Sequence, residues 1–107
     1  MMYKLCFFVP ESRLEKVKQA AFDAGAGRIG DYDHCCWQVA GQGQFRPLSG
    51  SDPFLGSSGE LETLTEYKVE MVCDRAHIRA AVEAMREAHP YEEPAYDVLQ
   101  VVTELPA

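Results

Sequence analysis

The chain has 107 residues, of which 10 are Lys or Arg and 17 are Asp or Glu, for a formal net charge of −7. This length fits one domain, residues 1–107, that buries a single core. The negative charge opposes binding to nucleic-acid phosphates and to anionic lipid headgroups, and no Lys/Arg run offsets it locally. The composition therefore disfavours nucleic acid and membranes as partners.

The N-terminal apolar segment is interrupted by Lys4 and ends at Pro10, so it is shorter than a signal-peptide core or a membrane span. The cysteines are Cys6, Cys35, Cys36 and Cys73. Two of them are adjacent, unlike the spaced cysteines of a small secreted domain with several disulfides. We therefore expect reduced thiols in a cytoplasmic protein.

Strand and helix periodicities alternate along the first part of the chain. Residues 3–9 alternate as in a strand, although the second face of this strand is also largely apolar. A helix is predicted after Pro10. Its predicted buried stripe consists of Leu14, Val17, Ala21 and Ala24. A second strand is predicted at Asp33–Ala40, and its alternation leads us to expect the Trp37 ring to be buried beneath the helices.

Glycine, proline and serine are too frequent over about residues 41–60 for regular structure, so this segment is predicted to be a long loop between two strands. Alternation over residues 61–73 predicts the strand that follows. A second helix is predicted after Asp74, a good N-cap, and it must end before Pro90. Its predicted buried stripe consists of Ile78, Ala81, Val82, Met85 and Ala88. The segment Ala95–Val102 is expected to form the last strand.

The predicted order is βαββαβ, which matches the ferredoxin-like class of α+β folds. In this class a four-stranded antiparallel sheet carries both helices on one face, and the other face is open. Cys6, Phe8, Leu64 and Val72 would then expose apolar area to water, and burial between subunits would remove it. We therefore expect a homo-oligomer, either a dimer or a trimer.

The segment GAGRIG, Gly25–Gly30, has the spacing of a dinucleotide-binding fingerprint. That fingerprint needs a strand before it and a helix N-terminus after it, so that amide groups face a pyrophosphate. Here a helix precedes the glycines and a strand follows them. Helix capping and a tight turn explain these glycines better than nucleotide binding does.

Two segments contain residue types that bind divalent metals. In DHCCW, His34 and Cys36 share one face of the predicted strand, and in HPYEEPAYDV the candidates are His89 and Glu92. A tetrahedral site needs more donors than either pair supplies, and no CxxC or HExxH motif is present. An edge or interface strand is the simpler interpretation of the first segment. A divalent metal held by these residues stays the alternative.

The favoured interpretation of HPYEEP is structural. His89 suits a helix C-terminus, Pro90 ends the helix, and Pro94 keeps Glu93 extended. Such a rigid path suits a surface presented to a neighbouring subunit, where Tyr91 would pack its ring. The sequence therefore predicts that HPYEEP is a helix stop and an assembly motif rather than a catalytic centre.

Three motifs in order give the chain a resemblance to a known family. They are G-x-G-x-I-G-x-Y-x-x-C, G-x-G-x-F-x-P-x-x-G-x-x-P-x-x-G and H-P-Y-E-E-P, with the strand YKVEMVC before the last one. Together they cover nearly the whole chain, which resembles the insert domain of NIF-three-like proteins, the YqfO group. This resemblance implies a fold like those of CutA and the PII signalling proteins, which are ferredoxin-like trimers.

The resemblance limits what can be carried over to this chain. Full-length NIF-three-like proteins have a dinuclear metal centre whose ligands lie in the two halves that flank the insert, so no metal ligand is implied here. The name GTP cyclohydrolase likewise belongs to the long form. The resemblance and the absence of an assembled catalytic set favour a non-enzymatic, self-associating binding or regulatory module without a cofactor. The alternative is a metal-binding protein or metal-dependent hydrolase.

Overall fold

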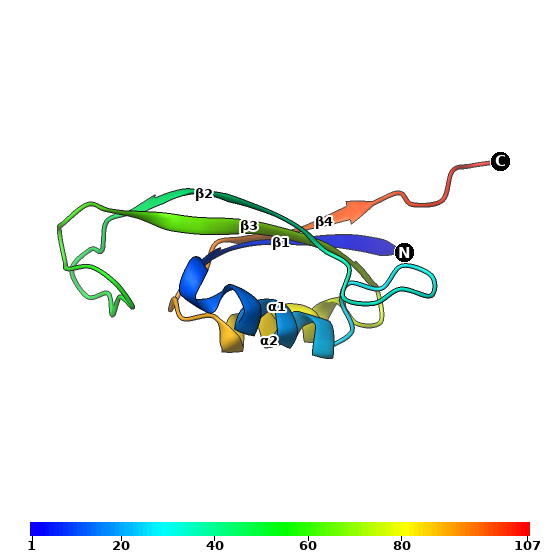
Figure 1. Ribbon diagram of the computed structural model, residues 1–107, viewed down its shortest axis with the longest axis horizontal. Helices are drawn as coiled ribbons and strands as arrows, with labels where there is room; N and C mark the ends of the chain where they lie inside the picture. The colour runs from blue at the N-terminus through cyan, green and yellow to red at the C-terminus, as the bar shows by residue number, and fades with distance from the viewer.

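In the computed structural model of residues 1–107, four strands form one antiparallel sheet in the order β2-β3-β1-β4. The elements are β1 (Met2–Pro10), a short 3-10 turn η1 (Glu11–Arg13), α1 (Leu14–Asp23), β2 (Trp37–Phe45), β3 (Glu62–Asp74), α2 (Ile78–Ala88) and β4 (Tyr96–Val101). Both helices lie under one face of the sheet (Figure 1). The predicted βαββαβ order and the ferredoxin-like fold class are confirmed.

Strand β1 lies in the middle of the sheet because it pairs with β3 on one side and with β4 on the other. Its alternate residues Leu5, Phe7 and Val9 are fully buried against the helices. The apolar residues predicted to be buried on α1 and α2 pack against these β1 side chains. The core cluster includes Leu14, Val17 and Ala21 of α1 and Ala81 and Met85 of α2, with Val69, Met71 and Cys73 of β3. Apolar periodicity therefore located the core correctly, except on β2.

The helix ends are set by local backbone chemistry. Gly25 follows the last residues of α1 with φ +111°, and a side chain at this position would collide with the ring of His77. This left-handed conformation is the one that ends many helices. Helix α2 begins at Ile78, later than predicted, because residues 75–77 first form a turn in which the Asp74 carboxylate accepts the backbone N–H of His77.

Strand β2 corrects the prediction for Trp37, whose side chain is 61% exposed. Trp37 pairs with Glu70, whereas Gln38 pairs with the buried Val69. Directly opposed residues of an antiparallel pair point to the same face, so Trp37 lies on the face away from the helices. The prediction failed because β2 begins at Trp37 rather than Asp33 and is the edge strand of the sheet, where none of its residues is buried on either face.

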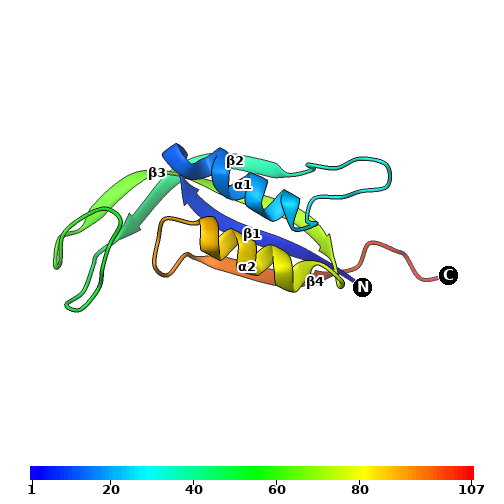
Figure 2. The ribbon, with the colours of Figure 1, turned by 90° about the horizontal axis from the view of Figure 1, so that it is seen from below.

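The predicted loop is also shorter than expected, because β2 continues to Phe45 and leaves residues 46–61 as the loop. Gln and Gly residues extend here because β3 supplies a continuous partner, from Trp37↔Glu70 to Phe45↔Glu62. The β2–β3 hairpin projects beyond the helices (Figures 1 and 2). The molecule is therefore elongated, 53 × 23 × 22 Å, with a radius of gyration of 15.1 Å, against about 13 Å for a compact chain of this length.

No helix is long and apolar enough to cross a membrane.

Candidate functional site

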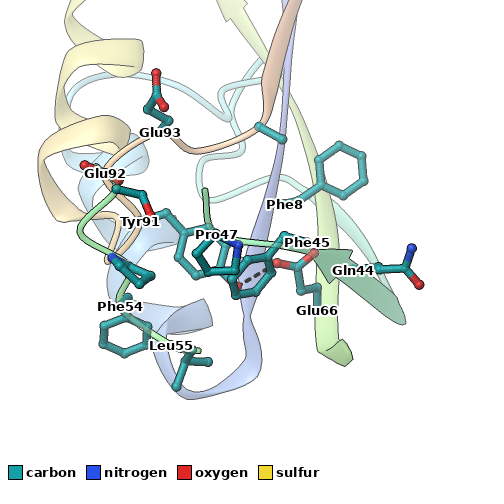
Figure 3. Close-up of a pocket in the computed structure, with 13 residues that line it drawn as sticks. Phe8, Gln44, Phe45, Pro47, Phe54, Leu55, Glu66, Tyr91, Glu92 and Glu93 are labelled. Atoms are coloured by element: carbon teal, nitrogen blue, oxygen red, sulfur yellow. Dashed lines mark hydrogen bonds between the residues drawn. The ribbon is translucent and has the colours of Figure 1, made fainter. Parts of the chain in front are cut away.

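A cavity of about 270 Å³ lies where the projecting hairpin meets the segment between α2 and β4. Its walls come from β1, the β2–β3 hairpin, the 46–61 loop and the 91–95 segment (Figure 3). The lining residues are Phe8, Gln44, Phe45, Pro47, Ser51, Pro53, Phe54, Leu55, Glu66, Tyr91, Glu92, Glu93 and Ala95. Aromatic and other apolar side chains alternate there with carboxylates.

His89 anchors the 91–95 segment to the sheet. Its side chain is 6% exposed, and its Nε2 lies 2.7 Å from the carbonyl oxygen of Phe8. Its Nδ1 accepts the backbone N–H of Tyr91 at 3.1 Å. These partners require a proton on Nε2 and none on Nδ1, which is the neutral tautomer. Burial lowers the pKa of His89, although the Phe8 carbonyl and Glu66 oppose that shift.

Tyr91 is at the centre of the cavity wall. Its hydroxyl donates to Oε2 of Glu66 at 2.8 Å, as the dashed line in Figure 3 shows. Its ring lies 6.0 Å from the ring of Phe45 and 6.3 Å from that of Phe54. Burial and the bond to Glu66 raise the pKa of Tyr91 well above its ordinary value. The tyrosine is therefore a neutral hydrogen-bond donor at physiological pH.

Glu66 reaches the cavity because Gly43 leaves room for it. A Cβ at Gly43 would overlap the carboxylate of Glu66, which shows that the glutamate side chain passes over the glycine backbone. Only Oε2 of Glu66 has a hydrogen-bond partner within the chain, the Tyr91 hydroxyl. Oxygen Oε1 is left as a free acceptor beside aromatic rings.

Two further contacts hold the 46–61 loop beside the cavity. Oε1 of Glu92 accepts the backbone N–H of Asp52 at 2.9 Å, which ties the 46–61 loop to the segment after α2. The guanidinium of Arg13 lies 5.4 Å from the centre of the Phe54 ring, within the range of a cation–π interaction. The loop is thus held to the body of the protein by one polar contact and one aromatic contact.

The structure separates the predicted metal ligands. His34 is exposed, hydrogen-bonds with Gln19 at 3.3 Å and packs at a tilt against the ring of Phe22 in the C-terminal half of α1. Cys36 is exposed near it, whereas His89 and Glu92 lie at the cavity. No group of three or more His, Cys, Asp or Glu side chains is placed to hold a metal ion. Metal binding by these four residues stays a prediction.

The residues predicted to form an interface differ in their exposure. Phe8, Leu64 and Val72 are half-buried, while Cys6 is only 5% exposed. The expectation that Cys6 contributes apolar area to an open face is therefore wrong, because its own neighbours already cover it. Tyr91 is also half-buried, and its ring and hydroxyl have partners within its own chain. An interface role for Tyr91 stays a prediction.

Sequence reasoning missed most residues of the cavity. Phe45, Phe54 and Glu66 lie in different segments, and each one alone is typical of an ordinary loop or strand. Glu66 in particular belongs to a strand whose polar residues alternate with apolar ones, a pattern that predicts solvent exposure. Two motifs carried a signal: the prolines on both sides of Tyr91 in HPYEEP indicate a rigid path, and the family motif of residues 41–56 includes Phe45, Pro47 and Pro53. Neither motif indicated that these residues share a cavity.

Solved structures place the chain in a structural class. CutA from Archaeoglobus fulgidus, a periplasmic divalent cation tolerance protein, has a TM-score of 0.68 at 13% identity, covering 98% of this chain and 88% of that one. This likeness extends along almost the whole of both chains. The chain is therefore an α+β domain with the CutA-like fold.

Sequence comparison identifies its relatives. A Mycobacterium tuberculosis protein named GTP cyclohydrolase 1 type 2 homolog is 48% identical over 99 residues, which are 92% of this chain and 26% of that protein. The structure of a Bacillus cereus protein related to NIF3 has a TM-score of 0.77 at 42% identity, covering 92% of this chain and 25% of that one. The chain is a homologue of one domain-sized part of the NIF3-related proteins, and the expected resemblance to their insert domain is confirmed.

The chain spans about a quarter of the length of the relatives that it matches. No protein-family model matches it. What the long relatives do as whole proteins therefore does not transfer directly to this chain.

Proposed function

We propose that this chain is a cytoplasmic, non-enzymatic, self-associating module that binds a small ligand in the cavity at the base of the hairpin. One observation carries the proposal: the Tyr91 hydroxyl and the Glu66 carboxylate converge on a cavity built from four separate parts of the chain. Small-molecule sites are typically apolar cavities with a few convergent polar groups.

The groups in the cavity favour binding over catalysis. The Ser51 hydroxyl donates to the carbonyl of Leu48 at 2.7 Å, so it is not paired with a base. Tyr91 holds its proton, and its partner Glu66 accepts a hydrogen bond from it. An activated nucleophile needs a lowered pKa or a base that removes its proton, whereas the raised pKa of Tyr91 keeps the proton on its hydroxyl.

The relatives' name suggests a guanine nucleotide, but the cavity argues against one. Its volume of about 270 Å³ is at or below the lower end of the usual range for small-molecule pockets, roughly 300–1,000 Å³. Carboxylates at Glu66, Glu92 and Glu93 would repel a triphosphate. A ligand smaller than a nucleotide, and not anionic, fits the cavity better.

The open face of the sheet supports self-association. Trp37 and Val39 on β2 are 61% and 43% exposed on this face, and Leu99 on β4, at the opposite edge of the sheet, is 54% exposed. Burial between subunits would remove this apolar area from water. Four charged residues surround Cys6 on this face: Lys4, Lys68, Glu70 and Asp97. Charges of both signs let two copies of this face meet without net repulsion, despite the overall charge of −7.

Sedimentation velocity of the chain and two variants tests the self-association. We expect an oligomer for the unaltered chain and a monomer for Val72→Glu, which adds a charge to the open face. The matched control is Leu105→Glu, a 90% exposed residue in the C-terminal tail. A monomeric unaltered chain, or an unchanged oligomer for Val72→Glu, would contradict this part of the proposal.

Metal analysis of the purified protein separates the proposed binding module from the metal-dependent alternative. Stoichiometric divalent metal that survives dialysis and is lost in His34→Ala or His89→Ala would favour the alternative. Metal-free protein that still forms its oligomer would support the binding module. The number of subunits, two or three, follows from the same sedimentation data.

A further inference from the structure

We infer that the cavity at the base of the hairpin binds a small organic cation, an ammonium or guanidinium group joined to an apolar body. This inference rests on the proposed function, because it names the class of ligand that the proposed binding module takes. Aromatic rings, an unpaired carboxylate oxygen, a cation already seated on one ring and the size of the cavity together support it.

The aromatic rings provide the first part of the site. Phe45, Phe54 and Tyr91 surround the cavity with tilted rings 6.0 and 6.3 Å from the central tyrosine. Aromatic faces carry partial negative charge, so rings that converge on one space attract a cation, as they do in cages for quaternary ammonium groups. The same rings also contact an apolar ligand body.

The carboxylate of Glu66 provides the second part. Tyr91 donates to Oε2, which orients the carboxylate and leaves Oε1 without a partner in the chain. A cation is the natural partner for a half-buried carboxylate oxygen, because a charge-assisted hydrogen bond offsets its lost hydration. Glu92, by contrast, already uses one oxygen to hold the backbone of Asp52.

The protein itself places a cation beside one of these rings. The Arg13 guanidinium lies 5.4 Å from the centre of the Phe54 ring. Arg13 comes from η1, so this cation reaches Phe54 from outside the loop. Its position shows that Phe54 accepts a cation in this environment, and the carboxylates of Glu66, Glu92 and Glu93 outnumber that one positive charge.

The size of the cavity excludes large cations. A volume of about 270 Å³ accommodates a single small ring with a short amine chain but not a folded peptide. We therefore choose three probes with the same ring and chain length: phenethylammonium, its neutral counterpart 2-phenylethanol and its anionic counterpart phenylacetate.

Calorimetric titration of the unaltered chain with the three probes tests the inference. We expect saturable binding of phenethylammonium, binding of 2-phenylethanol weaker by about tenfold or more, and no binding of phenylacetate. Equal binding of the cation and the alcohol would overturn the inference, because the site would then be merely apolar. Dissociation constants weaker than roughly 10 mM for every probe would also overturn it.

Two pairs of variants locate the site. Glu66→Gln keeps the size of the side chain and an acceptor for Tyr91 but removes the charge, so phenethylammonium should bind about tenfold more weakly. The matched control Glu70→Gln, on the same strand outside the cavity, should bind it normally. Gly43→Ala should displace the Glu66 carboxylate and weaken binding, whereas Gly41→Ala has no atom within 4 Å to disturb.

Unchanged affinity in Glu66→Gln, or an equal loss in Glu70→Gln, would show that binding is not due to this cavity and would overturn the inference. Sedimentation of the same samples separates this result from the proposed self-association. An oligomer that binds no cation would refute the ligand class alone, whereas a monomer that binds phenethylammonium at Glu66 would refute the self-association alone.

Discussion

The helix-covered end and the hairpin end of this molecule are stabilised by different kinds of interaction. Under the helices, β1 and the C-terminal half of β3 bury residues such as Leu5, Phe7 and Val69 completely. At the other end, the hairpin is attached through individual contacts, chiefly from Tyr91 to Glu66 and from Glu92 to the backbone of Asp52. Burial of apolar area is the larger stabilising term, so the helix-covered end should determine global stability. The hairpin end contributes less to global stability and contains the cavity, so its residues can be suited to ligand binding.

The largest expected effect comes from Phe7, which is fully buried in the core. Phe7→Ala should lower the free energy of unfolding by about 3–5 kcal/mol, because it removes a large apolar surface and leaves a cavity. The adjacent residue is a matched control: Phe8 is half-buried and points to the opposite face. Urea denaturation measures both variants. Equal losses for Phe7→Ala and Phe8→Ala would show that the two faces of β1 do not differ as described.

A smaller effect is expected at the hairpin end. Tyr91→Phe removes the hydrogen bond to Glu66 but keeps the ring, and it should lower the free energy of unfolding by about 1 kcal/mol. Tyr3→Phe is the control, since the Tyr3 hydroxyl contacts only the exposed Met1 sulfur. Amide exchange should show faster opening of residues 42–66 in Tyr91→Phe, with the core amides unchanged. Faster exchange throughout the core would contradict the division into two ends.

His89 joins β1 to the 91–95 segment, and its contribution to the free energy of unfolding should depend on pH. Burial holds the folded-state pKa of His89 below its ordinary value of 6.5. A histidine with a lowered pKa resists protonation in the folded state, so its contribution to stability is complete above about pH 6.5 and is lost as the pH falls through that value toward the folded pKa. The protonated ring would also bring an N–H against the N–H of Tyr91.

The test compares urea denaturation of the unaltered chain and His89→Gln at pH 8 and at pH 5.5. The unaltered chain should lose more stability on acidification than the variant does. An equal loss in both proteins would show that other groups cause the pH dependence. His77→Gln is a second control, because His77 is half-exposed and pairs with Asp74 instead of contacting the 91–95 segment. Its loss of stability on acidification should resemble that of the unaltered chain.

The smallest effect on stability is expected at Trp37. Because its side chain is 61% exposed, Trp37→Ala should change the free energy of unfolding by only about 0.5 kcal/mol. A buried ring at this position would have implied a loss of about 3–5 kcal/mol. The same variant should weaken self-association in sedimentation experiments. A large loss of stability in the monomer would restore the original prediction that Trp37 belongs to the core.

Sequence alone predicted the element order, the helix stripes and the burial of β1, because these depend on periodicity over many residues. It failed at β2, because this strand lies at the edge of the sheet and none of its residues is buried, so the apolar alternation around Trp37 did not indicate a core face. It also failed at the cavity. The contact of Tyr91 with Glu66 joins residues 25 positions apart in the chain, and no local pattern encodes such a contact. Gly43 shows the same limitation, because its role is to leave room for a side chain from another strand.

The pairing of β1 with β4 has a consequence for how the chain folds. Met2 is aligned with Val101, and Phe7 with Tyr96, so the central strand has one neighbour from the far end of the sequence. Such distant pairings form slowly, because a long loop must close before any contact compensates for the lost entropy. During synthesis, β1 can pair with β3 as soon as Asp74 has emerged, but its other edge stays open until β4 emerges from the ribosome. A ribosome-bound chain that stops before Tyr96 should therefore expose the edge of its most apolar strand, and it would be the form of this protein most in need of a chaperone.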